Sequence, residues 1–167
     1  MSEIDELRAT VEALAARVRH LEDVVEISQL VAQYGPDVDS GSPEATAELW
    51  TEDGTFDAVG AITMRGREQI AGMVRSDGHQ GLILNGCGHV LTAPHVVVDG
   101  DIAHGRSYAL NIRWDAEAER FWVARVSANG WTWVRTDDGW RIKDRVNANL
   151  DGTAEHRDVL APIPAAD

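Results

Sequence analysis

The second half of the chain consists of long extended runs, which limit the possible fold more than any other feature of the sequence. Four stretches rich in Val, Ile and Trp follow one another: residues 90–98, 102–114, 121–135 and 140–149. A short segment lies between each stretch and the next: residues 99–100, 115–119 and 137–139. Each of these segments begins with Asp and two contain Gly, as is typical of turns. The pattern predicts an antiparallel meander.

The first half has the spacing of helices instead. Apolar residues at 27, 30, 31 and 34 predict a helix that kinks or ends at Gly35-Pro36, because proline removes a backbone donor. Ser42-Pro43 predicts the start of a short helix. A hairpin over residues 55–65 and a helix over residues 67–74 follow. Helices followed by a meander predict an α+β fold in layers, and the 167-residue length favours one such domain.

The chain opens with a heptad repeat. Seven apolar residues, which we call the heptad stripe, alternate three and four positions apart: Ile4, Leu7, Val11, Leu14, Val18, Leu21 and Val25. Three heptads of this kind favour a helix that associates with another subunit. The alternative is an amphipathic helix that lies on its own domain. We therefore divide the chain into an oligomerisation helix (1–25), a main domain (26–152) and a C-terminal tail (153–167).

Charge and composition exclude several classes of function. The formal net charge is −13, which argues against nucleic acid and anionic membranes, since both are bound by clustered Lys and Arg. No apolar run reaches the roughly 20 residues of a membrane-spanning helix. We expect no secretory signal, because no basic segment followed by an apolar one stands at the N-terminus. The single cysteine, Cys87, fits a reducing compartment, so we expect a cytoplasmic protein.

Common catalytic motifs are absent from the sequence: it has no phosphate-binding loop, dinucleotide fingerprint, nucleophile elbow, HExxH or CxxC. The six histidines are scattered and no cluster of Cys or carboxylate residues completes a zinc ligand set, so we expect no metal. We also expect no cofactor. What remains is Tyr34 and Asp39 near the end of the second predicted helix, and His89 at the start of the first long strand.

These three residues form a chemically coherent set. Histidine can exchange a proton near neutral pH, and an aspartate beside its other ring nitrogen fixes the tautomer. A tyrosine hydroxyl can hydrogen-bond a substrate oxygen. Sequence spacing alone does not bring Tyr34, Asp39 and His89 together, and a histidine near a strand start is more often structural.

The order of several segments carries a family resemblance: Tyr34 and Asp39, then GREQI (66–70), GHVLTAP (88–94) and WVRTDDGWRI (133–142). This order resembles the SnoaL-like branch of the nuclear-transport-factor-2 superfamily. Within it, the chain is similar to the group that includes bile acid 7α-dehydratase, scytalone dehydratase and hexachlorocyclohexane dehydrochlorinase. The resemblance implies a cone-shaped α+β barrel, a bent antiparallel sheet wrapped around helices with a deep pocket inside.

The resemblance also implies roles for individual residues. Asp39 matches the aspartate of a catalytic dyad and His89 matches its general base. Tyr34 matches the tyrosine (a lysine in the dehydrochlorinase) five positions before the aspartate, so we expect all three residues to be catalytic. Asn149 falls where a polar or arginine pocket residue is expected. Alternation along residues 121–133 leaves open which face points inward, and Trp131 is the aromatic residue that we expect to contact a ligand.

Together these points predict a cofactor-independent lyase, specifically a dehydratase, for a small hydrophobic substrate of polycyclic, steroid or polyketide type. There are two alternatives: an isomerase or polyketide cyclase of the same fold, or a non-catalytic binding module. The resemblance further implies self-association as a trimer or dimer.

Overall fold

The structure is a computed structural model that describes residues 2–164. The helices are α1 (Glu3–Asp39), α2 (Pro43–Glu48), α3 (Gly66–Arg75), α4 (Asp77–Leu84) and α5 (Ala154–Asp158). The strands are β1 (Trp50–Ala58), β2 (Ile62–Arg65), β3 (Cys87–Leu91), β4 (His95–Asp99), β5 (Ile102–Asp115), β6 (Arg120–Thr136) and β7 (Gly139–Asn149). The predicted α+β class is confirmed.

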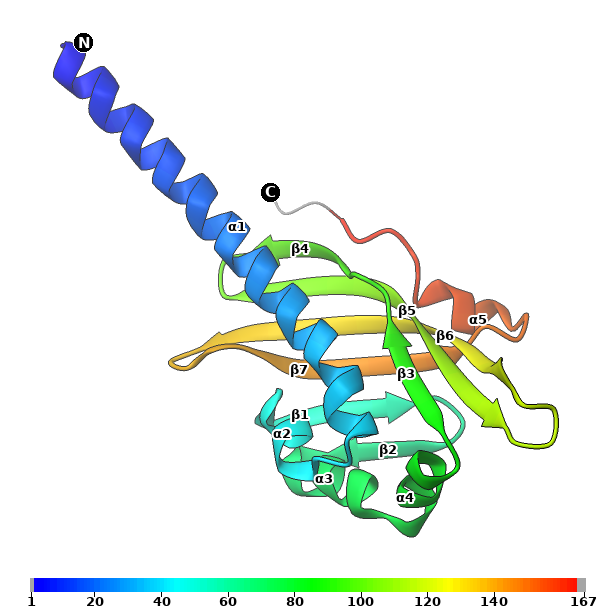
Figure 1. Cartoon of the computed structure of the whole chain (residues 1–167). Coiled ribbons are helices and arrows are strands. Elements are labelled where there is room, and N and C mark those ends of the chain that lie inside the picture. Colours follow the sequence, from blue (N-terminus) through cyan, green and yellow to red (C-terminus); the bar gives the residue numbers. More distant parts are fainter. Residues whose placement is uncertain (1, 165–167) are drawn as a thin grey trace.

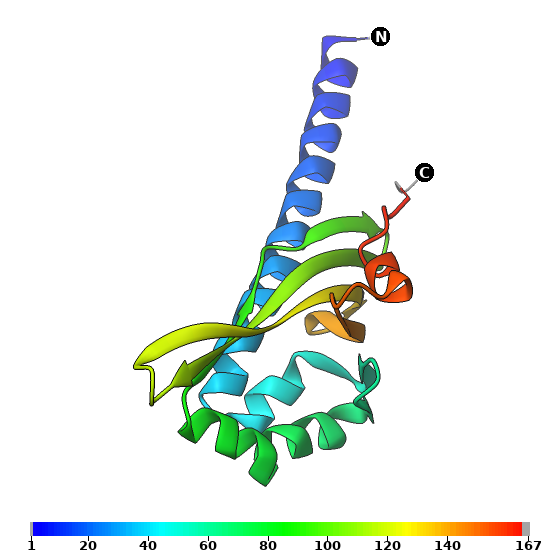
Figure 2. The same cartoon turned by 90° about the vertical axis from the view of Figure 1, so that its right-hand side faces the viewer.

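One curved, unclosed sheet holds all seven strands, in the order β2-β1-β7-β6-β5-β3, with β4 also paired to β5. β5, β6 and β7 form the expected antiparallel meander, whereas β1 joins β7 in parallel. Helix α1 crosses one face of the sheet, and α2, α3 and α4 gather at one end of the molecule with β1 and β2 (Figure 1). α5 and the C-terminal segment lie on the other face of the sheet (Figure 2).

The single strand expected over residues 90–98 is wrong. The structure has two strands there, β3 and β4, which pair with successive parts of β5. Thr92, Ala93 and Pro94 separate them, and Pro94 cannot donate a ladder hydrogen bond because it lacks an N–H group. Two helices, α4 and α5, were not anticipated; residues 165–167 of the expected tail lie outside the described residues.

The helix expected to kink or end at Gly35-Pro36 does not end there. α1 is continuous across the proposed division after residue 25 and includes Pro36 in its last turn. The missing N–H of Pro36 removes one helical hydrogen bond, but the Pro36 carbonyl accepts from the Ser40 amide at 2.9 Å, so the turn closes beyond it. This last turn carries Asp39.

The two ends of α1 have different surroundings. From Ile27 onward one face of the helix enters the hydrophobic core, where Ile27, Val31 and Val38 are at most 1% exposed. The heptad stripe is 51–64% exposed, and the N-terminal part of α1 extends away from the sheet (Figures 1 and 2). The alternative of a helix that covers its own domain is therefore wrong.

Candidate functional site

A cavity of about 200 Å³ opens between the end of α1, helices α3 and α4, and the concave face of the sheet. Most of its wall is apolar, with side chains such as Phe56, Met64, Leu82 and Leu91. Its polar side chains are six: Tyr34, His79, His89, Asn111, Arg125 and Arg145. The cavity thus combines an apolar wall with a few convergent polar groups, as ligand sites usually do.

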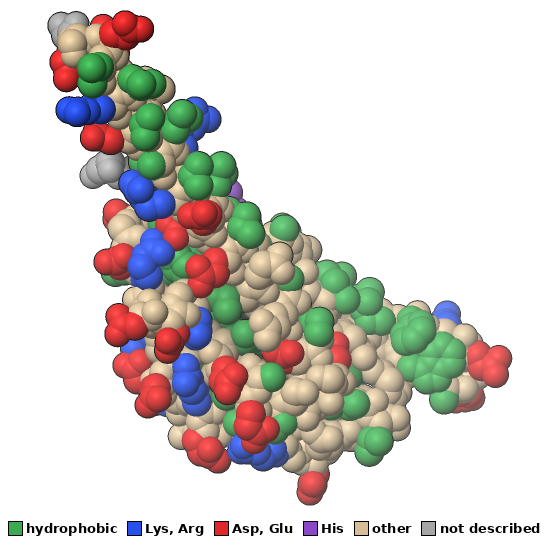
Figure 3. Space-filling model, turned by 60° about the vertical axis from the view of Figure 1, so that its left-hand side comes forward, with side chains coloured by type: hydrophobic (Ala, Val, Ile, Leu, Met, Phe, Trp, Pro, Cys, Tyr) green, Lys and Arg blue, Asp and Glu red, His purple; other side chains and the backbone are tan. Residues whose placement is uncertain are grey.

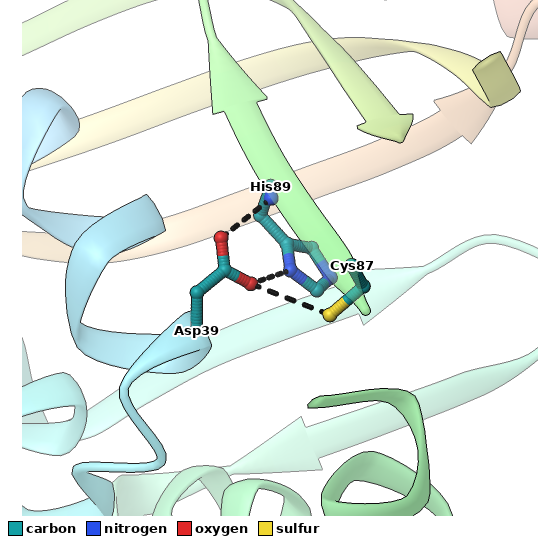
Figure 4. A group of neighbouring side chains, drawn as sticks. All are labelled: Asp39, Cys87 and His89. Carbon is teal, nitrogen blue, oxygen red and sulfur yellow. Dashed lines mark hydrogen bonds and ion pairs between the residues drawn. The ribbon is translucent and has the colours of Figure 1, made fainter. Parts of the chain in front are cut away.

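His89 lines this cavity, and its side chain is in direct contact with Asp39 (Figure 4). His89 Nδ1 lies 2.6 Å from Asp39 Oδ1, and the His89 backbone amide donates to Asp39 Oδ2 at 2.7 Å. The carboxylate is therefore held by two hydrogen bonds from one residue. Both side chains are largely buried, with 25% of Asp39 and 16% of His89 exposed.

A glycine allows this contact. A Cβ atom on Gly35 would lie 2.3 Å from the His89 carbonyl oxygen, closer than any real contact. Only glycine lets α1 approach β3 this closely. The helix then needs one more turn to bring Asp39 alongside the His89 ring, and it makes that turn through Pro36.

The electrostatics of the pair fix its protonation pattern. Burial acts to raise the pKa of Asp39, but the hydrogen bonds from the ring and backbone of His89 outweigh it, so this pKa lies below its usual value. An ionised carboxylate only accepts hydrogen bonds, so Nδ1 of His89 carries the proton. When the ring is neutral, Nε2 is then the nitrogen without a proton.

Cys87 approaches the same carboxylate oxygen as the His89 ring. Its thiol donates to Asp39 Oδ1 at 3.7 Å, and burial together with the Asp39 charge raises the pKa of Cys87. Asp39, Cys87 and His89 could each offer one metal ligand, with the ligand atoms within 4.8 Å of one another. Two donors of one zinc ion normally stand roughly 3 Å apart or more. The 2.6 Å between Oδ1 and Nδ1 is instead the length of a charge-assisted hydrogen bond.

His79, on the unanticipated helix α4, supports the histidine of the pair. Its ring lies 5.6 Å from the His89 ring, centroid to centroid, with 32° between the planes. His79 Nε2 lies 2.9 Å from the Val38 carbonyl oxygen, so this nitrogen is the donor and ties α4 to the end of α1. His79 thereby packs against His89 from a fixed position.

Tyr34 lies in the cavity wall as expected, and a residue that the sequence reasoning missed lies against it. The Arg145 guanidinium is 4.3 Å above the Tyr34 ring, 4.6 Å from the Phe56 ring and 4.7 Å from the Trp131 ring. Its Nε donates to the Asn129 side-chain oxygen at 3.1 Å, whereas Nη1 is buried without a hydrogen-bond partner. Arg145 is only 3% exposed, and burial lowers its pKa.

A β-bulge explains why Arg145 was missed. Trp140 and Ile142 point into the core, so strict alternation would turn residue 145 outward. The pairing of β6 with β7 shifts between Thr132 and Trp133, and the extra residue in β7 turns Arg145 inward. No signal in the sequence locates such a bulge.

Arg125 brings a second guanidinium to the cavity. It is half-buried, its Nε donates to the Asn111 side-chain oxygen at 3.0 Å, and burial lowers its pKa. Among the described residues, no acidic side chain forms an ion pair with Arg125 or Arg145. The cavity therefore holds cationic groups whose charge the protein itself leaves uncompensated.

Two expected site residues lie elsewhere. Trp131 does not line the cavity: it packs beneath Arg145, stacks on Trp133 and donates its indole N–H to Ser107. Asn149 lies beyond the cavity at the end of β7, where its side-chain oxygen accepts from Ser127. Neither Trp131 nor Asn149 therefore lines the cavity that holds His89, whereas Arg145 does.

The sequence of residues 19–146 matches the family model of the SnoaL-like domain. The chain belongs to the SnoaL-like family. An NTF2-like protein with a cystatin-like fold from Novosphingobium aromaticivorans is 46% identical, with a TM-score of 0.86 over 89% of this chain and 96% of that one. No curated protein matches significantly.

More distant solved structures share the fold alone. A protein of unknown function from Mycobacterium tuberculosis is 24% identical, with a TM-score of 0.68 over 100% of this chain and 85% of that one. A provisionally named scytalone dehydratase from Novosphingobium aromaticivorans is 19% identical, with a TM-score of 0.65 over 82% and 88% of the two chains. The family and fold expected from the sequence are thus confirmed. Within the described residues, no helix is both long and apolar enough to cross a membrane.

Proposed function

We propose that this SnoaL-like protein is a lyase that removes water from a small substrate by acid–base catalysis, with His89 as the base. The observation that carries the proposal is the 2.6 Å hydrogen bond between His89 Nδ1 and Asp39 Oδ1 in the wall of the cavity. It fixes the tautomer of His89 and leaves Nε2 to accept a proton. Asp39 also stabilises the imidazolium that forms when that proton arrives.

The reaction begins with proton abstraction. His89 Nε2 takes a proton from a carbon beside a carbonyl, and the C–H electron pair moves toward the carbonyl oxygen, giving an enolate. We assign Arg145 to this oxygen, because its buried, unpaired Nη1 is a donor with no protein acceptor. A preorganised donor of this kind is a common means of stabilising a developing negative charge.

Loss of water completes the reaction. The enolate re-forms the carbonyl as the C–O bond to a hydroxyl on the neighbouring carbon breaks, which leaves a carbon–carbon double bond. The hydroxyl departs as water after it takes the proton carried by His89, so the enzyme returns to its starting state. We assign Tyr34 to a hydrogen bond with the departing oxygen. These steps use side chains only, so we propose that no cofactor is needed.

The cavity also bears on the substrate. A volume of about 200 Å³ compares with the roughly 150 Å³ of an engineered cavity that binds benzene. The enclosed space suits one or two rings, and the further rings of a steroid would have to extend through the opening. We therefore propose a one- or two-ring β-hydroxy carbonyl compound as the core of the substrate.

The test is turnover of a panel of one- and two-ring β-hydroxy ketones, followed by mass spectrometry. We expect products lighter by one water from the wild type. His89→Ala should lower turnover by at least 10²-fold, whereas the exposed-histidine control His104→Ala should not. Products of unchanged mass would assign the site to an isomerase or cyclase instead. Panel members that bind without any turnover would overturn the enzyme proposal in favour of a binding module.

A further inference from the structure

The heptad stripe is the largest feature of the molecule that the proposed function leaves unused. Its seven side chains are all more than half exposed, and they follow one another along the projecting part of α1 (Figure 3). Water contact with a continuous apolar row of this length is unfavourable. Residues 1–18 precede the region that matches the family model, so most of the stripe is not needed to build the domain.

We propose that a second copy of this chain covers the heptad stripe, forming a parallel two-stranded coiled coil over Glu3–Val25. The side chains at the two seam positions support this number of strands. The first seam position carries only β-branched residues, and the second carries only leucine: Ile4, Val11, Val18 and Val25, then Leu7, Leu14 and Leu21. In parallel coiled coils, this distribution favours two strands over three or four.

Charges beside the seam support the parallel direction. In a parallel, in-register pair, Glu3 of one copy faces Arg8 of the second copy, and Arg17 faces Glu22. Symmetry doubles both attractive pairs, and no like charges face one another at these positions. In an antiparallel pair Arg8 would face Glu22, but Glu3 and Arg17 would lose their charged partners. The parallel arrangement satisfies all four charges.

The position of the domain leaves room for the second helix. Val25 belongs to the stripe and Ile27 to the buried face, and two residues in a helix turn by about 200°. The stripe therefore faces away from the side of α1 that packs on the sheet. A second helix can approach it without meeting the domain of the first copy. The folded domain also holds the C-terminal part of α1 in helical form, which lowers the cost of helix nucleation that short coiled coils otherwise meet.

Light scattering coupled to size-exclusion chromatography of the full chain tests the stoichiometry. We expect two chains per particle for the wild type, and one for Leu14→Asp, which places a charge in the seam. Ala16→Asp is the matched control: it adds the same charge two residues away, outside the seam, and should remain dimeric. Circular dichroism and thermal melts check that each variant is folded. A wild type with one or three chains per particle, or a Leu14→Asp variant of unchanged mass, would overturn the proposal.

A charge exchange tests the direction. Arg17→Glu and Glu22→Arg each place two like-charge pairs across a parallel seam, whereas a mixture of the two variants restores attraction at both places. We expect each variant alone to dimerise several-fold more weakly than the mixture. Equal association of the mixture and of the separate variants would overturn the parallel arrangement, because neither change creates this complementarity in an antiparallel pair.

Discussion

The two ends of α1 belong to one continuous helix but obey different constraints. The N-terminal end, Glu3–Val25, has a strict heptad pattern and exposes it. The C-terminal end, 26–39, buries one face in the core, carries Tyr34 to the cavity and places Asp39 against His89. The heptad pattern of the N-terminal end can be predicted from residue spacing alone, whereas the positions of the side chains at the C-terminal end depend on the elements against which they pack. Substitutions that are chemically alike should therefore have different effects at the two ends.

The largest contrast should come from the same substitution at both ends. Ile27 is fully buried in the core and Ile4 is 63% exposed. We expect Ile27→Ala to lower the free energy of unfolding by about 2–5 kcal/mol, because it leaves a cavity in the packed core. Ile4→Ala should change it by no more than about 0.5 kcal/mol. Urea unfolding of both variants at low protein concentration measures the difference, and equal losses would mean that the projecting end also packs on its domain.

Activity and stability should respond differently to a change at Arg145, the β7 residue that packs on Tyr34 in the C-terminal end of α1. Arg145→Met keeps a long apolar side chain and removes a buried charge that has no acidic partner. We expect stability to change by less than about 1 kcal/mol or to rise. Turnover should fall about 10²–10³-fold, because the proposed enolate loses its donor.

Arg135→Met is the matched control for this variant. Arg135 binds Asp23 through two hydrogen bonds of 2.7 and 2.9 Å, far from the cavity. Removing it should cost roughly 1 kcal/mol of stability and leave turnover unchanged. An Arg145→Met enzyme of wild-type activity would remove Arg145 from the mechanism.

A substitution at the close contact between α1 and β3 should have a smaller effect on stability. Gly35→Ala places a methyl group against the His89 carbonyl oxygen, so helix and strand must separate. We expect a stability loss of about 1–3 kcal/mol and a clear loss of turnover, because Asp39 moves away from His89. Gly72→Ala is the control, since nothing lies within 4 Å of the added atom and alanine favours its helix, α3; it should stabilise by about 0.5–1 kcal/mol. Thermal melts together with turnover distinguish the two variants.

The smallest effect should be the pH dependence that Asp39 adds to stability. Its pKa is lowered in the folded protein, so its contribution is present above the unfolded value of about 3.9 and is lost as the pH falls through the folded value. The wild type should therefore be more stable than Asp39→Asn at neutral pH, by on the order of 1 kcal/mol. This difference should shrink below about pH 4, as measured by urea unfolding at several pH values. A difference that grows toward low pH would contradict the lowered pKa.

Features that depend on local spacing could be predicted from the sequence. The heptad stripe, the meander of β5, β6 and β7 and the turns between them follow from periodicity and turn residues. The family resemblance then proposed the proximity of Asp39 and His89, which no local pattern contains. Pro36 predicted the end of a helix. The helix continues to Asp39 instead, because the Ser40 amide donates a hydrogen bond to the Pro36 carbonyl and Val38 packs in the core.

The rest of the site depends on tertiary detail that spacing does not contain. The bulge in β7 turns Arg145 into the cavity and places Asn149 beyond it. Trp131 is buried against Arg145 and Trp133 and does not line the cavity. His79 is brought to His89 by α4, whose sequence has little helical periodicity and contains two glycines. In each case a non-local contact decides the position of the side chain.

The central claim, that His89 held by Asp39 removes a proton from carbon, has a direct test. Members of the β-hydroxy ketone panel that carry deuterium beside the carbonyl would be incubated with the protein in water, and loss of deuterium followed by NMR. We expect rapid loss with the wild type, a much slower loss with Asp39→Asn and none above background with His89→Ala. Loss of deuterium at the wild-type rate in a folded His89→Ala variant would contradict the account.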